Sequence, residues 1–483
     1  MGKINKKTTI LALFSLIFYL ESAVAQIKEE WVAVYNAFTL GAARVCRIDV
    51  DATGNVYVAG SIVVSLSEYF IIKYDANGTQ LWVSRYGGTE GTSSELAAMV
   101  VDPAGNVYAT GSSAGDYATI KYDANGNELW VARYRGPYGG GPATAIAVDA
   151  AGNVYVTGAI SGCYEGTDYA TIKYDANGNE QWIARYNAPG DWYDSAQAIA
   201  VDTSGNVYVT GDSYEGGWRG KAGYATIKYD SNGNELWVAR YNGPDILNDT
   251  PTSLAVDAVG NVYVTGYSQV PGDTSDYATI KYDDNGNEKW VARYNGKAHF
   301  EDPLSLVIDA AGNVYVAGST KTDNGKDYTT IKYDNNGNEK WLAQYDGPGT
   351  SWDPMESNSD DIAESLAVDA EGNVYVTGSS LGSVGGYDYT TVKYDPGGNE
   401  MWVSRHNGLN DNNDFARALA LDAAGNVYVT GGARDTPFLH ATTIKLVQNS
   451  GDNNNGDGGD NNVVDSGKNG GGGGGCFITA TLR

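Results

Sequence analysis

The sequence predicts an all-β protein that forms a single eight-bladed β-propeller, with four antiparallel strands in each blade. The motif Asp-x-x-Gly-Asn-Val-Tyr occurs eight times, with a mean spacing of (426 − 55)/7 = 53 residues. Each repeat divides into four short strands separated by tight turns, and four strands in about 50 residues are typical of a propeller blade. The asparagines of the motif are Asn55, Asn106, Asn153, Asn206, Asn261, Asn313, Asn373 and Asn426.

The chain begins with a predicted signal peptide, residues 1–25. Lys3, Lys6 and Lys7 precede an apolar run, and the small residues Ala23 and Ala25 follow it, as at a secretory cleavage site. The apolar run is too short for a comfortable membrane span, although a membrane anchor is the alternative interpretation. We therefore expect an exported protein, extracellular or on the cell surface of a bacterial envelope, whose mature chain has no transmembrane segment.

One repeat shows the four expected strands clearly. They are residues 196–202, 206–211, 224–230 and 234–241, each rich in β-branched and aromatic residues. The pair Asn232-Gly233 between the last two predicts a two-residue hairpin turn in which both residues have positive φ. No segment between repeats has a long helical period, so we do not expect a parallel sheet with helical crossovers.

The phase of the repeat predicts how the ring closes. A Trp marks the last strand of each blade and occurs eight times, at Trp31, Trp82, Trp130, Trp182, Trp237, Trp290, Trp341 and Trp402. Trp31 precedes the first complete repeat, and the last repeat lacks a Trp strand. We therefore expect the N-terminal strand to complete the eighth blade, with the propeller spanning residues 30–448. Seven blades plus an additional module is the alternative.

The repeat resembles that of the bacterial SBBP β-propeller repeat family, in which units such as Ala-x-Ala-Ile-Ala-Val-Asp-x-x-Gly-Asn-x-Tyr-Val-Thr-Gly follow one another in secreted proteins. The resemblance covers residues 30–447. It implies the propeller fold and export, and it implies little about chemistry, because the family is largely without an assigned activity.

Charge and cysteine content narrow the class of partner. Lys and Arg number 32 and Asp and Glu 59, for a formal net charge of −27, so nucleic acids and anionic membranes would be repelled. Three cysteines in 483 residues are too few for a disulfide scaffold. We expect a monomeric propeller whose partner is an extracellular protein or glycan.

The loops of the predicted fold divide between two faces. Tight, nearly identical turns occupy one face, and the long, dissimilar loops occupy the other, which we call the variable face. Binding residues usually lie on variable loops of a rigid scaffold. Exposed aromatic residues in these loops are the candidate ligand contacts, with mere coverage of the blade ends as the alternative: Tyr164, Trp192, Tyr193, Trp218 and Trp352.

Acidic residues recur at one register of the variable face. The register lies eight residues before the Asp of the Asp-x-x-Gly-Asn-Val-Tyr motif. Five of the eight repeats carry a carboxylate there, and these carboxylates predict an acidic ring at one mouth of the central channel. Oxygen ligands suit calcium, so a bound calcium ion is one hypothesis. Capping of backbone amides in the neighbouring loop is the other. The residues are Asp194, Asp249, Glu301, Asp361 and Asp414.

The sequence favours a non-catalytic binding or scaffold role without excluding an enzyme. His299, His406 and His440 are scattered, and no nucleophile or zinc-protease motif is present. The chain also resembles eight-bladed quinoprotein dehydrogenases, whose repeats place a Trp shortly after an Asp-x-x-x-Gly turn. Here the spacing from Asp230 to Trp237 is one residue shorter than in those repeats, and the chain has no adjacent cysteine pair. A polysaccharide hydrolase or lyase, a quinoprotein-like enzyme and a passive envelope component are the alternatives.

After the last strand the composition changes. Residues 449–475 are almost entirely Gly, Asn, Asp and Ser, which predicts a disordered tether. Residues 476–483 resemble the Cys-Phe-Ile-Ala-Thr-Ala sorting tail of some exported bacterial proteins, although Thr479 replaces the Ala. The resemblance implies processing or attachment at Cys476.

Overall fold

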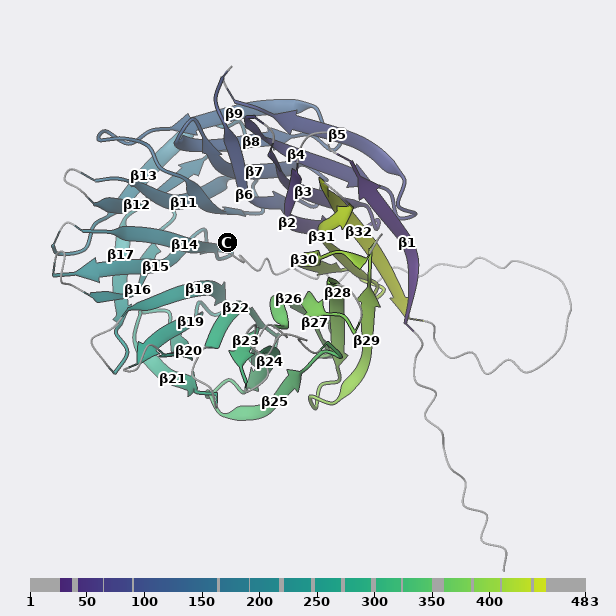
Figure 1. Cartoon of the computed structure of the whole chain (residues 1–483). Coiled ribbons are helices and arrows are strands. Elements are labelled where there is room, and N and C mark those ends of the chain that lie inside the picture. The colour runs from purple at the N-terminus through teal and green to yellow at the C-terminus, as the bar shows by residue number, and fades with distance from the viewer. Residues whose placement is uncertain are drawn as a thin grey trace, which may run out of the picture.

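The computed structural model describes residues 27–36, 42–63, 65–88, 91–162, 166–190, 192–216, 221–244, 248–270, 274–296, 301–322, 325–349, 360–383, 386–408, 411–435 and 438–448. The strands β1 to β32 form eight four-stranded antiparallel sheets arranged as a ring, the predicted eight-bladed propeller (Figure 1). Within the described ranges, no helix has the length and apolar character needed to cross a membrane.

Each blade uses consecutive strands, which we call A to D from the axis outward. Blades 1 to 4 consist of β2 (Ala42–Val50), β3 (Val56–Val63), β4 (Ser67–Tyr74) and β5 (Gln80–Tyr86); β6 (Ser94–Val101), β7 (Val107–Ser113), β8 (Asp116–Tyr122) and β9 (Glu128–Tyr134); β10 (Ala143–Val148), β11 (Val154–Ser161), β12 (Thr167–Tyr174) and β13 (Glu180–Tyr186); and β14 (Asp194–Val201), β15 (Val207–Glu215), β16 (Lys221–Tyr229) and β17 (Glu235–Tyr241).

The second half of the ring repeats this order. Blades 5 to 7 consist of β18 (Asp249–Val256), β19 (Val262–Val270), β20 (Thr274–Tyr282) and β21 (Glu288–Tyr294); β22 (Glu301–Ile308), β23 (Val314–Lys321), β24 (Lys326–Tyr333) and β25 (Glu339–Tyr345); and β26 (Ile362–Val368), β27 (Val374–Leu381), β28 (Tyr387–Tyr394) and β29 (Glu400–His406). Blade 8 takes β30 (Asp414–Leu421), β31 (Val427–Asp435) and β32 (Phe438–Gln448) from the end of the propeller and β1 (Ile27–Tyr35) from its beginning.

The ring closes through β1, as the phase of the repeat predicted. β1 pairs antiparallel with β32 from Ile27, opposite Gln448, to Tyr35, opposite Ala441. The Trp31 indole donates a hydrogen bond to the carbonyl of Ala76 in blade 1, 3.1 Å away. The first strand of the chain therefore completes the last sheet and also joins it to the first (Figure 1).

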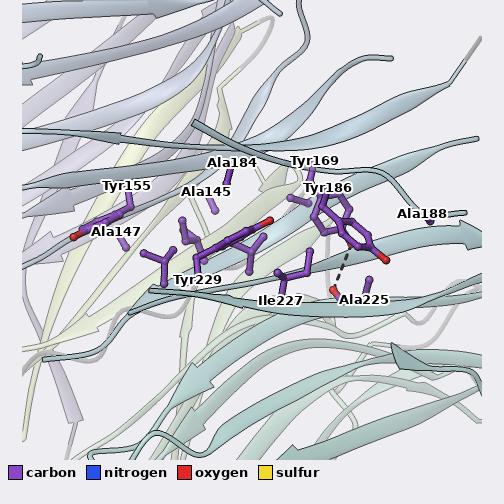
Figure 2. Close-up of a cluster of buried hydrophobic side chains, with 14 residues drawn as sticks. Ala145, Ala147, Tyr155, Tyr169, Ala184, Tyr186, Ala188, Ala225, Ile227 and Tyr229 are labelled. Atoms are coloured by element: carbon purple, nitrogen blue, oxygen red, sulfur yellow. Dashed lines mark hydrogen bonds between the residues drawn. The ribbon is translucent and has the colours of Figure 1, made fainter. Parts of the chain in front are cut away.

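The core lies between the blades. Eight clusters of buried side chains each join neighbouring sheets, and Figure 2 shows the cluster between blades 3 and 4. There the Tyr169 hydroxyl crosses to the next blade and donates to the carbonyl of Ala225, 3.4 Å away. Burying aromatic rings with their hydroxyl groups paired gives each interface apolar contact area and a fixed register. The recurring tyrosines thus hold the scaffold together.

The Asp-x-x-Gly-Asn-x-Tyr motif organises the turn between strands A and B. In blade 4, Oδ1 of Asp202 accepts from the backbone amides of Ser204 and Asn206, at 2.8 and 2.9 Å. Its Oδ2 accepts from the Asn206 side chain at 2.8 Å and from the Tyr208 hydroxyl at 3.0 Å. Gly205 has φ of 78°, a conformation that glycine adopts without strain. The motif is therefore explained by turn structure.

The turn between strands C and D differs from the prediction. Gly233 has a positive φ of 83°, but Asn232 does not, and the pairing register shifts at Lys228 and Tyr229. The backbone carbonyl of Asp230 accepts from the amide of Gly233, and the backbone amide of Asp230 donates to the carbonyl of Asn234. The connection is thus a longer turn followed by a bulge, with the Asp side chain supplying hydrogen bonds that a two-residue turn would not need. The prediction of two positive φ values was wrong.

Candidate binding site at the channel mouth

A bulge in every A strand determines which side chains are unpaired at the propeller axis. In blade 8 the register shifts between Ala416 and Ala418, and it leaves Arg417 without a cross-strand partner. Opposite the bulge stands Gly431, where a Cβ atom would lie 1.9 Å from the carbonyl oxygen of Phe415. The Gly that ends each Val-Tyr-Val-Thr-Gly segment is therefore needed for close backbone approach. The bulge residues are Cys46, Ala97, Thr144, Gln197, Thr252, Leu304, Glu364 and Arg417.

The bulge residue varies around the ring, with Thr in blades 3 and 5, and several bulge residues connect one A strand to the next. Thr144 donates to the carbonyl of Ala196, and Thr252 donates to that of Pro303, both at 2.8 Å. Glu364 forms a close ion pair with Arg417 across the corresponding boundary. This inner ring is the part of the scaffold where the repeat is broken.

A cavity of about 510 Å³ opens where blades 1, 2, 7 and 8 meet. Its lining comes from the first halves of A strands and from residues near the B–C hairpins, which are the strand ends at the variable face. We call it the mouth cavity. The lining residues are Ala43, Arg44, Val45, Cys46, Arg47, Ser61, Val63, Glu95, Leu96, Glu364, Phe415, Arg417, Gly432 and Leu439.

Three arginines and two glutamates make the mouth cavity polar. Arg44 is exposed, whereas Arg47 donates to the carbonyl of Cys46 at 2.7 Å. The guanidinium of Arg417 lies 5.7 Å from the centre of the Phe415 ring and also pairs with Glu364. Planar guanidinium groups are well suited to bind carboxylates and to stack on rings. The cavity thus offers cationic, aromatic and carboxylate contacts within one space.

Cys46 contributes a thiol to the wall of the mouth cavity. Its Sγ lies 3.7 Å from the carbonyl oxygen of Ala59 and 3.8 Å from that of Leu96. Burial raises the pKa of the Cys46 thiol, and the positive charge of Arg47 only partly opposes this effect. The thiol is therefore held protonated, as a small apolar group with a weak donor. The other two cysteines, Cys163 and Cys476, lie outside the described residues.

Asp49 is a half-buried acid near the other end of the same inner strand. Its Oδ1 accepts from the amide of Val50 at 2.8 Å, and its Oδ2 accepts from that of Val101 at 3.2 Å. Burial outweighs these hydrogen bonds and raises the pKa of Asp49 from 3.8 to about 6. The folded protein therefore binds this proton more tightly than the unfolded chain does.

The Asp49 shift predicts a pH effect on stability. Because the folded pKa is the higher one, its stabilising contribution is fully present below about pH 4 and is lost as the pH rises through about 6. We expect Asp49→Asn to gain stability relative to the wild type as the pH rises from about 4 to about 6, measured as urea midpoints. Glu95→Gln, which changes an exposed acid, should stay parallel to the wild type. If the difference in urea midpoint between the wild type and Asp49→Asn did not vary with pH, the expectation would be wrong.

Only two of the five predicted aromatic contacts lie among the described residues. Trp192 is half-buried and Tyr193 is 45% exposed, with ring centroids 5.3 Å apart in an edge-to-face pair. They stand in the link between blades 3 and 4, away from the lining of the mouth cavity. Tyr164, Trp218 and Trp352 lie outside the described residues, as does Cys476.

The predicted acidic ring is divided among separate blades. Asp194 accepts from Ser213 Oγ at 2.5 Å and from the Ala188 amide at 2.8 Å. Asp414 accepts from the amides of Gly408 and Arg434, at 2.6 and 3.0 Å. Asp249 and Asp361 hold the same kind of backbone donor, while the side chain of Glu301 lies outside the described part. The described carboxylates thus cap their own loops, and burial raises the pKa of each.

Sequence reasoning missed the residues of the mouth cavity. Arg44, Glu95, Glu364, Phe415 and Arg417 occupy A strands, which were treated as scaffold. A signal was present, because these registers hold a different residue in nearly every repeat. Departure from the repeat within a strand was therefore as informative as loop length.

Comparison with known proteins supports the repeat family. Residues 181–217, 236–273 and 356–385 match the family described as Beta-propeller repeat, SBBP. The regulatory protein FlaEY of Caulobacter vibrioides is 30% identical over 119 residues, 22% of this chain and 12% of that protein. The uncharacterized WD repeat-containing protein L264 of Acanthamoeba polyphaga mimivirus is 23% identical over 201 residues, 32% of this chain and 14% of that protein. The chain thus spans a small part of the length of these two relatives.

Among solved structures, Sqt1 from Chaetomium thermophilum, bound to the N-terminus of the ribosomal protein L10, is similar with a TM-score of 0.54. The likeness covers 86% of this chain and 99% of that chain at 10% sequence identity, so it concerns the fold alone. Three segments of the chain therefore match the SBBP beta-propeller repeat, and the eight sheets of four strands form a propeller.

Proposed function

We propose that the protein is an exported, non-catalytic binding propeller that holds an acidic extracellular glycan at the mouth cavity of its variable face. One observation carries the proposal. The mouth cavity is lined by charged and aromatic side chains that the other blades do not repeat, on a scaffold whose repeated residues are explained by turns and blade contacts. Residues that serve a single ligand are needed once, whereas residues that serve the scaffold recur.

The charge of the cavity suggests the chemistry of the ligand. Three arginines line one space in a protein whose formal net charge is −27. Arg44 is exposed, so its guanidinium is available for a carboxylate. The Phe415 ring offers an apolar face for a sugar ring, and Glu95 and Glu364 can accept from hydroxyl groups. A sugar chain with carboxylate groups supplies all three kinds of contact.

Localisation forms part of the same proposal. The basic and apolar N-terminal segment supports export, and the Gly- and Asn-rich segment before Cys476 supports a flexible attachment to a bacterial cell surface. A glycan-binding disc at the end of such a tether would sample a large volume. Fractionation of cells that express the full chain tests this, because we expect the propeller in the envelope or the medium.

The binding test uses the chain from residue 26 onward on an array of acidic and neutral oligosaccharides. We expect uronate-containing glycans to bind, and Arg44→Ala to weaken binding about tenfold, the size of one lost hydrogen bond between charged groups. Arg135→Ala is the matched control, because Arg135 is an exposed arginine that does not line the cavity. Arg417→Ala should weaken binding too, although it also leaves Glu364 without this partner.

Several outcomes would contradict the proposal. Equal binding of neutral and acidic glycans, or full binding by Arg44→Ala, would remove the cavity as the site. Capture of a protein partner with no glycan bound would replace the ligand class. Release of shorter oligosaccharides from the bound glycan would overturn the non-catalytic assignment.

A further inference from the structure

The D strand of blade 7 carries an arginine that ties two blades together at the variable face. Arg405 Nη1 donates to Ser380 Oγ at 2.7 Å and to the hydroxyl of Tyr345, in blade 6, at 3.1 Å. Its Nη2 donates to Oδ2 of Asp388 at 2.9 Å. One guanidinium thus binds a hydroxyl, a phenol and a buried carboxylate.

Blade 5 repeats this arrangement closely. Arg293 donates to the hydroxyl of Tyr241 at 2.6 Å, to Ser268 Oγ at 2.9 Å and to Asp276 Oδ2 at 2.8 Å. A cation between the B strand, the C strand and the preceding blade is therefore a regular part of these two blades.

Blade 6 keeps the acceptors and lacks the cation. Gln344 stands opposite Thr329, as Arg405 stands opposite Thr390, so it occupies the arginine register. Among the described residues, the Gln344 amide donates to the Thr329 hydroxyl alone, at 3.4 Å. Thr320, in the register of Ser268, is 1% exposed, and its hydroxyl has no hydrogen-bond partner within the described part of the chain. Thr320 pairs directly with Asp327, so both side chains lie on the same face of the sheet, within reach of a shared ligand.

Three carboxylates meet beside this vacant arginine position. Oxygen atoms of Asp327, Asp346 and Asp361 all lie within 4.8 Å of one another, the one such group in the described ranges. Asp327 is only 7% exposed. The carboxylates of Asp346 and Asp361 add two negative charges beside it. Lys326 does not compensate them, because its ammonium pairs with Asp302, 2.6 Å away.

The charge count differs from that one blade further on. There the corresponding positions hold Asp388, Asn407 and Asp414 together with Arg405, a sum of −2 + 1 = −1. In blade 6 they hold three aspartates and Gln344, a sum of −3. A divalent cation would return the sum to −1. Blade 6 thus has Gln344 where blades 5 and 7 have an arginine, and Asp346 where they have an asparagine. These two differences remove the guanidinium and add a carboxylate ligand for a metal ion.

We propose that Asp327, Asp346 and Asp361 bind one calcium ion between blades 6 and 7, with the Thr320 hydroxyl as a neutral oxygen donor. Carboxylate and hydroxyl oxygens are hard ligands, and calcium accepts irregular sets of them completed by water. Asp361 already accepts from the Gly347 amide at 2.5 Å, and a carboxylate oxygen has a second lone pair for a cation. The ion takes over the role that Arg293 and Arg405 have in their blades.

The chain supplies its own comparison variants. Gln344→Arg places the residue of blades 5 and 7 in blade 6, and Asp346→Asn places their asparagine there. Asp346 is exposed, so Asp346→Asn should fold normally. Glu339→Gln removes the same charge from an exposed position in the same blade and is the matched control.

The experiment titrates the full chain with calcium chloride, followed by calorimetry and by the thermal unfolding midpoint. We expect the wild type and Glu339→Gln to bind calcium with an upward shift of the midpoint. Asp346→Asn should bind at least tenfold more weakly, and Gln344→Arg should show neither binding at this site nor a shift while keeping the circular dichroism spectrum of the wild type. Equal calcium stoichiometry and affinity in all four proteins would overturn the site. Binding of magnesium or manganese in place of calcium would overturn the assignment of the ion.

Discussion

Removing β1 is expected to open the propeller. Deletion of residues 27–36 takes away the fourth strand of blade 8 and the Trp31 contact with blade 1. Loss of a packed Trp alone costs about 3–5 kcal/mol, and the deletion also exposes the backbone edge of β32. We expect a fall of at least that size in the free energy of unfolding, measured by urea denaturation, together with self-association on size exclusion.

Complementation in trans makes the same prediction specific. A synthetic peptide of residues 26–36 should restore the unfolding midpoint of the deleted chain, because β1 is held by strand pairing and side-chain packing alone. The same peptide with Trp31→Ala should restore it less. A deletion that leaves stability and the monomeric state unchanged would show that blade 8 does not need the N-terminal strand.

Gly431→Ala is expected to be the most damaging single substitution near the mouth cavity. A Cβ atom there would meet the Phe415 carbonyl oxygen at 1.9 Å and the Ala416 Cα at 2.8 Å. Since both are backbone atoms of the bulge, no side chain can move aside. We expect a loss of about 3 kcal/mol, measured as a shift in the urea midpoint, and displacement of Arg417 from the cavity.

Gly425→Ala separates the clash from the loss of glycine. Gly425 has φ of 78°, but a Cβ atom there would meet nothing within 4 Å. Only the conformational cost of about 1 kcal/mol then applies. If Gly431→Ala cost no more than Gly425→Ala, close approach at the bulge could not be the reason for the glycine.

The fold was predictable because the scaffold residues recur from blade to blade. The Asp of the A–B turn, the NG turn and the interblade Trp could be placed from spacing alone. Because the last repeat lacks a Trp strand and Trp31 precedes the first complete repeat, the sequence also predicted that the N-terminal strand closes the ring. The type of the C–D turn was not predictable, because the Asp230 carboxylate accepts from the backbone amides of Asn232 and Asn234, and these hydrogen bonds outweigh the Asn-Gly preference.

The candidate site was less accessible from the sequence. Its residues sit at a bulge, and a period-two strand pattern does not reveal which residue a bulge leaves unpaired at the axis. Acids at one register suggested a shared ring, but the register repeats once per blade, so each carboxylate caps its own loop. Asp361 differs from the other loop-capping acids only because Gln344 and Asp346 lie beside it, and these two residues belong to another blade.

The pairing of Ile27 with Gln448 also sets the order in which the molecule can be finished. Of the propeller strands, β1 is made before all the others and its partner β32 after them, so β1 waits through the synthesis of the intervening blades. A contact between the two extremes of the domain has the largest loop-closure entropy that the chain can meet. The ring must therefore be a late product of folding, formed only after the intervening blades have brought its two ends together.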